Sequence, residues 1–589
     1  MRLQNRLTTV NLSVLFVFLA FLSPAVATVT DQTDFSSRKR YGHVITKSDA
    51  SVGFPYFLSS FTGLLIDDGE DKGGEANGLD LVRRAPDGGS LGNNKFESRE
   101  ILMGEIQYWH FSNSFAGTST VNSTSDTPET STAKRATSTV YVSLTICSKP
   151  ILNESVSGAT QDLPQLAVYV STSDSLREPG PDKDSKDQTV HHSEEGYMSA
   201  MVPTESGVYI GVAAPNSGKF SGSYSYQLAA STDDFFHKFA DHSTLLTLVD
   251  ADSEAALLTT EAPADRILTE DQLKQWRNST GVYNIFINNA NNSPVAGMSR
   301  SYCALEQHSQ VGTGDGVEAS MSTRKRTNNE LQQQFYITGL NRSSTYNGVL
   351  AMSGNSSDSG NGVGGGGMVW RPEPFTTKSD RNCAVIYDLD FCSDIAYAVP
   401  SNPSMNLSQL RSKYDSHAED LYKNFNYSLQ QIQCNTSNET IFSMTVNCTV
   451  CATAYKDWLC AVTIPKCDDF SSTKNTSAVM IRNAAQAFPN GTEITNKTLR
   501  EDPVRNRSRN DLFIDKEIEP GPYKEVLPSI DVCHDLVRNC PMALGFQCPT
   551  GKWLQYSYSL SAGSILGTPS SLGFQAIILA AASGLLWLF

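Results

Sequence analysis

Short runs in which apolar and polar positions alternate occupy the middle of the chain. Glycine, proline, asparagine and serine separate these runs. The period of two predicts that each run is a strand with one buried face. Turn residues at this spacing are typical of an antiparallel β-sandwich, which we expect over residues 138–260. The runs of this first set are Thr139–Ile146, Leu166–Ser171, Gly207–Ala213 and Tyr224–Ala230.

A second set of runs predicts another β-rich domain over residues 261–380. The acidic segment around Asp250–Leu258, which precedes this set, favours a helix by composition. The stretch Phe335–Tyr346 resembles the penultimate-strand region of a fibronectin-III-like sandwich. The runs are Val282–Asn288, Met298–Leu305, Gln334–Thr338, Tyr346–Met352 and Met368–Trp370.

After residue 380 the apolar spacing changes to three and four, which indicates amphipathic helices. Cys533 and Cys540 stand seven positions apart, so a helix places both on one buried face. An α-rich, cysteine-rich domain is therefore expected over residues 381–552. An earlier helix is indicated by Leu407, Leu410, Tyr414, Leu421, Phe425, Leu429 and Ile432.

The N-terminal segment has the features of a secretion signal. Arg2 and Arg6 precede an apolar run, Leu12–Leu22, and a small-residue site ends at Ala27. We predict a signal peptide over residues 1–27, removed by cleavage. Residues 28–137 are expected to be a variable, partly disordered region that includes the Ser/Thr-rich stretch Ser112–Ser138.

The C-terminal segment resembles a glycosylphosphatidylinositol (GPI) signal. Small residues at Ser561–Ser564 lead through a polar stretch to the apolar run Phe574–Phe589. As a helix, that run spans about 24 Å, less than the ~30 Å of a hydrocarbon core. Residues 553–589 are therefore predicted to be a spacer and an anchor signal, with a short transmembrane helix as the alternative.

Cysteine usage indicates an oxidising compartment. Ten of the twelve cysteines lie between residues 383 and 548, and we expect them to form disulfides rather than a zinc site. Their pairing stays open, and Cys147 and Cys303 either pair or stay buried. The ten are Cys383, Cys392, Cys434, Cys448, Cys451, Cys460, Cys467, Cys533, Cys540 and Cys548.

Fourteen glycosylation sequons support passage through the secretory pathway. Nine of them fall between residues 406 and 506, so that region is expected to carry much sugar. Asn291 also begins a sequon, but Pro294 follows it. The fourteen are Asn122, Asn153, Asn278, Asn341, Asn355, Asn406, Asn426, Asn435, Asn438, Asn447, Asn475, Asn490, Asn496 and Asn506.

Charge and motifs exclude several classes of function. A net charge of −16 disfavours a nucleic-acid partner, which needs concentrated lysine and arginine. No nucleophile–base or metalloprotease motif stands out, so we expect no enzyme, no cofactor and no metal site. Asp388, Asp390 and Asp394 lack the ligand pattern of an EF-hand loop and are predicted to form an anionic patch.

Three cysteine segments resemble the fungal stretch-activated calcium-channel component, the Mid family. They are Cys383–Cys392, Cys448–Cys467 and Cys533–Pro549, and the strand-rich Gly196–Pro215 is similar to the N-terminal half of the family. This resemblance implies an accessory subunit on the extracellular face of the plasma membrane. Its implied partner is a large four-repeat calcium-channel α subunit that contains the pore.

The segment from Trp458 to Cys467 also looks like part of a frizzled-type cysteine-rich domain. That likeness implies docking on the extracellular loops of the partner. Cys434 and the long insert between Cys467 and Cys533 depart from the frizzled pattern, so its disulfide pairing is not transferred.

Five residues of the cysteine-rich region are candidates for contact with the partner. A different class of function, a GPI-anchored receptor or adhesin that binds a ligand through the same region, shares these signals. Packing or solvent exposure is the alternative role for each candidate. The candidates are Asp388, Asp390, Tyr455, Trp458 and Arg538.

Overall fold

The computed structural model describes most of the chain between residues 89 and 560. The predicted signal peptide, the interior of the Ser/Thr-rich stretch and the C-terminal tail lie outside the described residues. The described ranges are 89–112, 138–153, 163–241, 245–260, 283–291, 293–311, 316–325, 331–354, 365–432, 447–468, 470 and 478–560.

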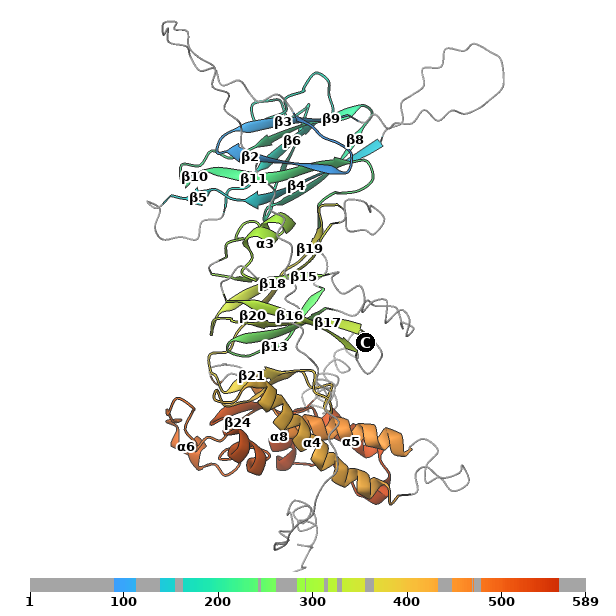
Figure 1. The fold of residues 1–589 in the computed structure, drawn as a ribbon, viewed down its shortest axis with the longest axis vertical. Helices are drawn as coiled ribbons and strands as arrows, with labels where there is room; N and C mark the ends of the chain where they lie inside the picture. Colours follow the sequence, from blue (N-terminus) through green and yellow to red (C-terminus); the bar gives the residue numbers. More distant parts are fainter. Residues whose placement is uncertain are drawn as a thin grey trace, which may run out of the picture. The chain divides into compact units, whose positions relative to one another are not determined.

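Two sheets face each other to form the first β-sandwich (Figure 1). Their strand orders are β1-β3-β9-β6-β7 and β2-β11-β4-β8, and β5 pairs with β10. Ile101, Val142 and Ile210 are fully buried between the sheets. The strands are β1 Gly89–Ser90, β2 Lys95–Leu102, β3 Ile106–Ser112, β4 Ser138–Ser148, β5 Ile151–Leu152, β6 Ala167–Ser171, β7 Thr189–His192, β8 Tyr197–Thr204, β9 Gly207–Ala213, β10 Phe220–Ser221 and β11 Ser223–Ser231.

Three strands of this sandwich come from a region for which the sequence predicted no sheet. β3 pairs with β9 in antiparallel register from Ile106 to Ser112. In β2 only Ile101 is buried, and the apolar Phe96 and Leu102 are exposed. An edge strand with one buried side chain gives almost no period-two signal, which explains why it was missed.

The next strands form two further sheets. One has the order β12-β19-β18-β15 with β20 beside β18, and the other has β13-β14-β17-β16. Leu258, Phe335 and Leu350 belong to their common core. The elements are β12 Lys238–Ala240, β13 Leu246–Ala251, β14 Ala255–Thr260, β15 Asn284–Asn289, α3 Tyr302–His308, β16 Glu318–Lys325, β17 Leu331–Thr338, β18 Thr345–Met352, β19 Met368–Trp370 and β20 Glu373–Thr376.

Two predicted elements in this part are wrong. The segment Asp250–Leu258 is not a helix but the β13–β14 hairpin, in which β14 is buried along its whole length against β17. Pairing on both sides overrides the helix propensity of its alanines and leucines. Met298–Leu305 is not a strand, because Ser301 caps α3 by accepting a hydrogen bond from the backbone N–H of Ala304.

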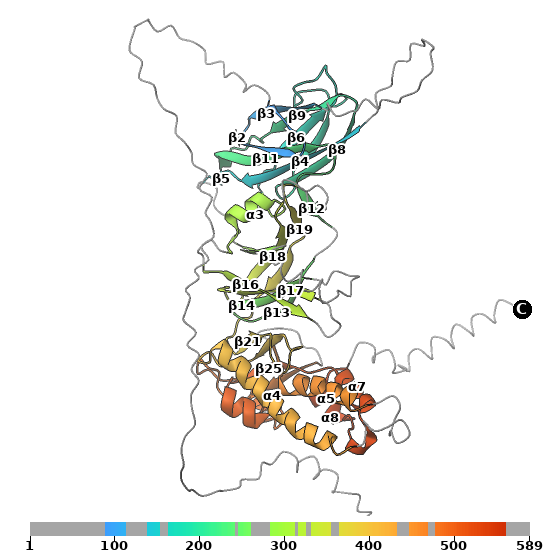
Figure 2. The same ribbon diagram turned by 45° about the vertical axis from the view of Figure 1, so that its right-hand side comes forward.

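Helices and short strands form the cysteine-rich region, so the predicted order of sheets first and disulfide-linked helices later is confirmed. Helix α5 contacts both α4 and α7 (Figure 2). The fibronectin-III-like and frizzled-like details stay predictions. The elements are β21 Cys383–Ile386, β22 Tyr397–Pro400, α4 Leu407–Leu429, α5 Cys448–Thr463, β23 Lys466–Asp468, β24 Val479–Arg482, α6 Lys497–Glu501, a π-helical segment Asp511–Ile518, β25 Tyr523–Val526, α7 Ile530–Asn539, a 3₁₀ turn Met542–Leu544 and α8 Lys552–Ser557.

Candidate functional site in the cysteine-rich region

Disulfides connect elements that are far apart in the sequence. Cys448 is also disulfide-bonded, whereas Cys434 lies outside the described residues. Cross-links of this kind restrict the unfolded chain and so stabilise the folded one. The disulfides described in full are Cys147–Cys303, Cys383–Cys467, Cys392–Cys460, Cys451–Cys540 and Cys533–Cys548.

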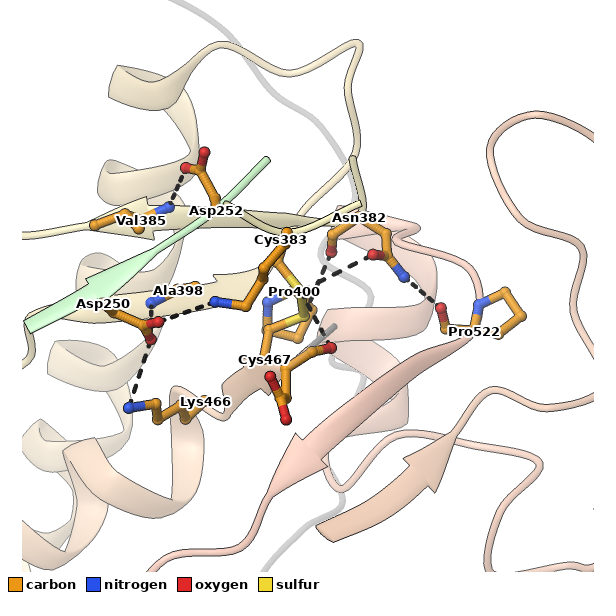
Figure 3. Close-up of a disulfide and its surroundings, with 12 residues drawn as sticks. Asp250, Asp252, Asn382, Cys383, Val385, Ala398, Pro400, Lys466, Cys467 and Pro522 are labelled. Carbon is orange, nitrogen blue, oxygen red and sulfur yellow. Dashed lines mark hydrogen bonds and ion pairs between the residues drawn. A yellow bond between two sulfur atoms is a disulfide. The ribbon is translucent and has the colours of Figure 1, made fainter. Parts of the chain in front are cut away.

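Asp250, at the end of β13, links the β-sheet part to the cysteine-rich region (Figure 3). Its carboxylate lies 2.9 Å from Lys378 Nζ and 3.5 Å from Lys466 Nζ, and it accepts a hydrogen bond from the backbone N–H of Ala398. Burial alone would raise the pKa of Asp250, but the two ammonium groups outweigh it and hold the pKa below its usual range. Asp250 is therefore a charged anchor of this joint.

Asp252 forms the second anchor of the joint, two residues later. One oxygen accepts hydrogen bonds from the N–H groups of Glu254 and Ala255, and the other accepts one of 2.8 Å from Val385 in β21. Burial raises the pKa of Asp252, because these N–H groups offset only part of its desolvation. The same carboxylate thus closes the β13–β14 turn and holds the strand that carries Cys383.

The disulfide Cys383–Cys467 lies beside these two carboxylates, between β21 and β23 (Figure 3). Next to it, the side-chain amide of the buried Asn382 donates to the carbonyl of Pro522. A covalent bond, charged anchors and backbone hydrogen bonds therefore meet in one place.

An aromatic cluster holds the helices of this region together. The rings of Tyr455 on α5 and Phe425 on α4 are stacked with their centroids 3.5 Å apart. Trp458 Nε1 donates a 2.8 Å hydrogen bond to the hydroxyl of Tyr558, which follows α8. Both α5 side chains thus fix neighbouring elements, and each is half-buried.

A buried charge cluster anchors the last described residues. Glu525 on β25 is completely buried and accepts hydrogen bonds from Arg482 and Arg509 at 2.5 and 2.7 Å. These guanidinium groups also donate to the carbonyls of Tyr556 and Ser557. Burial alone would raise the pKa of Glu525, but the two arginines outweigh it and hold the pKa below its usual range.

The five predicted contact residues do not come together in one surface. Asp388 accepts from Gln334 on β17 at 2.8 Å, so it joins two parts of this chain. Tyr455 and Trp458 lie in the aromatic cluster, and the exposed Arg538 lies 3.3 Å from Asp535. Asp390 is exposed. The role of all five in partner contact stays a prediction.

Eight of the fourteen sequon asparagines lie in the described ranges. The side chains of Asn406, Asn447 and Asn496 cap α4, α5 and α6 by accepting backbone N–H groups, and all three are exposed. Asn341 and Asn490 are also exposed, and Asn153, Asn426 and Asn506 are half-buried. The other six, Asn122, Asn278, Asn355, Asn435, Asn438 and Asn475, lie outside the described residues.

Among the described residues, no three histidine, cysteine, aspartate or glutamate side chains gather in a way that could hold a metal ion. No described helix has the length and apolar character that crossing a bilayer requires.

The charged residues at these sites were missed by reasoning from the sequence. Asp250 lies between two apolar residues of β13, where an unpaired charge is unfavourable, and that was the available signal for its burial. Lys378 and Glu525 lie close to other charged residues in the sequence and gave no such signal. Their partners could not be identified in advance, because Lys378 lies 128 positions from Asp250.

Comparison with known proteins identifies a family and three relatives, two of which align with more than half of this chain. The protein family Mid1, described as "Stretch-activated Ca2+-permeable channel component", matches residues 139–571. The stretch-activated cation channel yam8 of Schizosaccharomyces pombe is 33% identical over 392 residues, which are 63% of this chain and 71% of that protein.

The stretch-activated cation channel MID1 of Saccharomyces cerevisiae is 30% identical over 393 residues, which are 62% of this chain and 65% of the yeast protein. MID1 of Cryptococcus neoformans var. grubii is 25% identical over 199 residues, 32% of this chain and 31% of its own length. The residues that the family matches include strands of both β-sheet parts and the cysteine-rich region. The relatives bear the names of channels rather than of enzymes.

Proposed function

Because the chain belongs to the Mid1 family of stretch-activated Ca2+-permeable channel components, we propose that it is an extracellular accessory subunit of a plasma-membrane calcium channel. In this role it supports stretch- or stress-activated calcium influx through a pore formed by a large four-repeat α subunit. The observation that carries the proposal is the family description itself, since a component acts within an assembly.

The chemistry of the described region supports an extracellular location. Its disulfides are of a kind that persists in oxidising compartments. Exposed asparagines of the sequons Asn406 and Asn447 are available to the glycosylation machinery of the secretory pathway. The tail beyond residue 560 is proposed to hold the chain at the membrane by a lipid anchor or a short helix.

The helices support a role as a folded domain beside a pore. Helix α4 buries Tyr414 and Phe425 on one face and exposes Asp420 and Lys423 on the other. This is the pattern of a helix that packs on a domain in water. We therefore assign docking on the α subunit to the cysteine-rich region.

Affinity capture from gently solubilised membranes tests the proposal. We expect a large four-repeat channel subunit among the proteins captured with a tagged chain, in near-equal amount. Capture of wall or soluble ligands without a channel subunit contradicts it and favours the receptor or adhesin alternative. Robust unitary calcium currents from the purified chain alone in a bilayer also contradict it.

A further inference from the structure

A groove of about 550 Å³ lies between helices α5 and α7. Val450 and Ala454 of α5 and Val532 of α7 give it an apolar floor, and Thr453, Asp457 and Asp535 supply polar groups. The α5 residues follow each other at spacings of about four, so they share one face of the helix. Val450 is 39% exposed, which leaves apolar surface open to a ligand.

The walls of this groove are fixed by covalent and packing contacts. The disulfide Cys451–Cys540 ties the start of α5 to the end of α7. Leu536 packs with Cys451 and Cys540 beneath the groove. A groove that is already formed loses little conformational entropy on binding, which favours recognition of a partner.

The charges at the groove select for a basic ligand. Asp457 forms no salt bridge within the part of the chain that the structure describes. Burial and the nearby Asp394 raise the pKa of Asp457, and Lys456 offsets only part of the effect. Asp535 adds a second carboxylate, 57% exposed, whose ion pair with Arg538 faces solvent. A cationic side chain placed here would offset the repulsion between Asp457 and Asp394 and would also face Asp535.

We propose that this groove docks a basic, amphipathic segment on the extracellular surface of the channel α subunit. An apolar side chain of the segment lies on Val450, Ala454 and Val532, and a lysine or arginine next to it reaches Asp457 and Asp535. The proposal rests on the proposed function and adds the site and chemistry of the contact. Asn447 begins a sequon at the Val450 end, so the segment enters from the Asp457 end.

Charge reversal tests the electrostatic half of the proposal. Full-length chain is co-expressed with the α subunit, solubilised in mild detergent, and captured through a tag. We expect Asp457→Lys combined with Asp535→Lys to lower the co-captured α subunit at least tenfold. Asp420→Lys is the matched control, since Asp420 is an exposed carboxylate on α4. It should capture as much α subunit as the unaltered chain.

A glycan wedge tests the same groove by steric block. Asp535→Asn together with Val537→Thr creates an Asn-Leu-Thr sequon on α7, and Val537 is already 40% exposed. Glycosylated molecules of this variant should fail to capture the α subunit, whereas enzymatic removal of the glycan, which leaves an aspartate, should restore capture. Secretion and non-reducing gel mobility confirm that each variant has folded.

The outcomes separate the two proposals. If the unaltered chain captures the α subunit and both groove variants capture it equally well, the groove proposal is wrong and the accessory role stands. If the unaltered chain captures no α subunit, both proposals are wrong. Loss of capture in the control Asp420→Lys as well would show a general charge effect and overturn the groove assignment.

Discussion

Lys378 Nζ lies 2.9 Å from Asp250 Oδ1 although the two residues are 128 positions apart, and both side chains are almost hidden from water. The same ammonium group donates to the carbonyl of Ala251. The pair joins the end of β13 to the segment that leads into β21. This ion pair is therefore buried at the joint where Asp250 also contacts Ala398 and Lys466 of the cysteine-rich region.

Asp250→Asn should destabilise the chain strongly. It leaves the Lys378 ammonium group buried without its counter-charge, a change that typically costs about 3–5 kcal/mol. Chemical denaturation of the purified full-length chain measures the loss. Glu254→Gln is the control, because Glu254 pairs with Arg342 and Arg381 in solvent and should cost less than about 1 kcal/mol. Equal losses would contradict the assignment of Asp250 as an anchor.

Disulfides that close longer loops should contribute more stability. Cys392–Cys460 spans 68 positions and Cys533–Cys548 spans 15. In the chain-entropy model, replacing the first pair by serines costs about 1 kcal/mol more than replacing the second. Denaturation midpoints of the two double variants test the order.

The single changes Cys460→Ser and Cys540→Ser should misfold the region and abolish calcium influx, so normal influx from both would argue against the disulfide framework.

Glu525→Gln should loosen the attachment of the last described residues. Two guanidinium groups would then stay buried without a carboxylate, at a cost of about 3–5 kcal/mol. Hydrogen exchange should increase first in residues 552–560, which those groups hold. Glu517→Gln removes a carboxylate that lies 3.3 Å from Lys413 on the surface, so exchange should hardly change.

His237 should make stability depend on pH. Its ring is buried, with Ser143 Oγ 3.1 Å from Nδ1, and burial lowers the pKa of His237 to about 3. The unfolded chain takes up a proton near pH 6.5, where the folded chain does not. The neutral His237 therefore contributes its full share of the free energy of unfolding above about pH 6.5. As the pH falls toward 3, this contribution decreases by at most about 1.4 kcal/mol per pH unit.

Comparing unfolding free energies from pH 7 to pH 4 isolates the contribution of His237. His237→Gln should flatten this part of the profile, and the exposed His192→Gln should leave it unchanged. A profile that is equally steep in all three chains would refute the role of His237.

The sequon at Asn506 should stay unglycosylated in the folded protein. Asn506 Oδ1 is buried, and Ser508 is 4% exposed and hydrogen-bonded to Tyr523. A glycan at Asn506 would prevent this burial, so molecules that carry it should fail to fold. Glycopeptide mass spectrometry of the secreted chain should find sugar at the exposed Asn490 and none at Asn506. Substantial occupancy at Asn506 would contradict the prediction.

Periodicity alone predicted the elements whose burial has a regular pattern. In strand β11, buried and half-buried positions alternate from Ser223 to Leu228, and α4 buries one stripe, so local spacing is enough to find these elements. β14 is buried throughout, and a continuous apolar run does not distinguish a strand from a helix. Its identity comes from β13 and β17 on either side.

The candidate site was less predictable than the fold. The cysteines and their compartment followed from composition, since ten cluster in one region. Disulfide partners and the contacts of Asp250 depend on which distant segments meet, and no local pattern contains that information. Tyr455 and Trp458 were predicted as candidates for partner contact, with packing as the alternative. The structure shows both packing within the chain, and their contact with a partner stays a prediction.

The hydrogen bonds around Ser559 determine where a pulling force on the tail enters the fold. Force applied beyond residue 560 first loads the bonds of Ser559 with the carbonyl of Pro528 and the N–H of Ile530. If these bonds break, the chain can be drawn out only as far as Cys548, because that residue is covalently tied to Cys533. Extension of the domain from its C-terminal side therefore has a covalent stop, which bounds how far tension can unravel it.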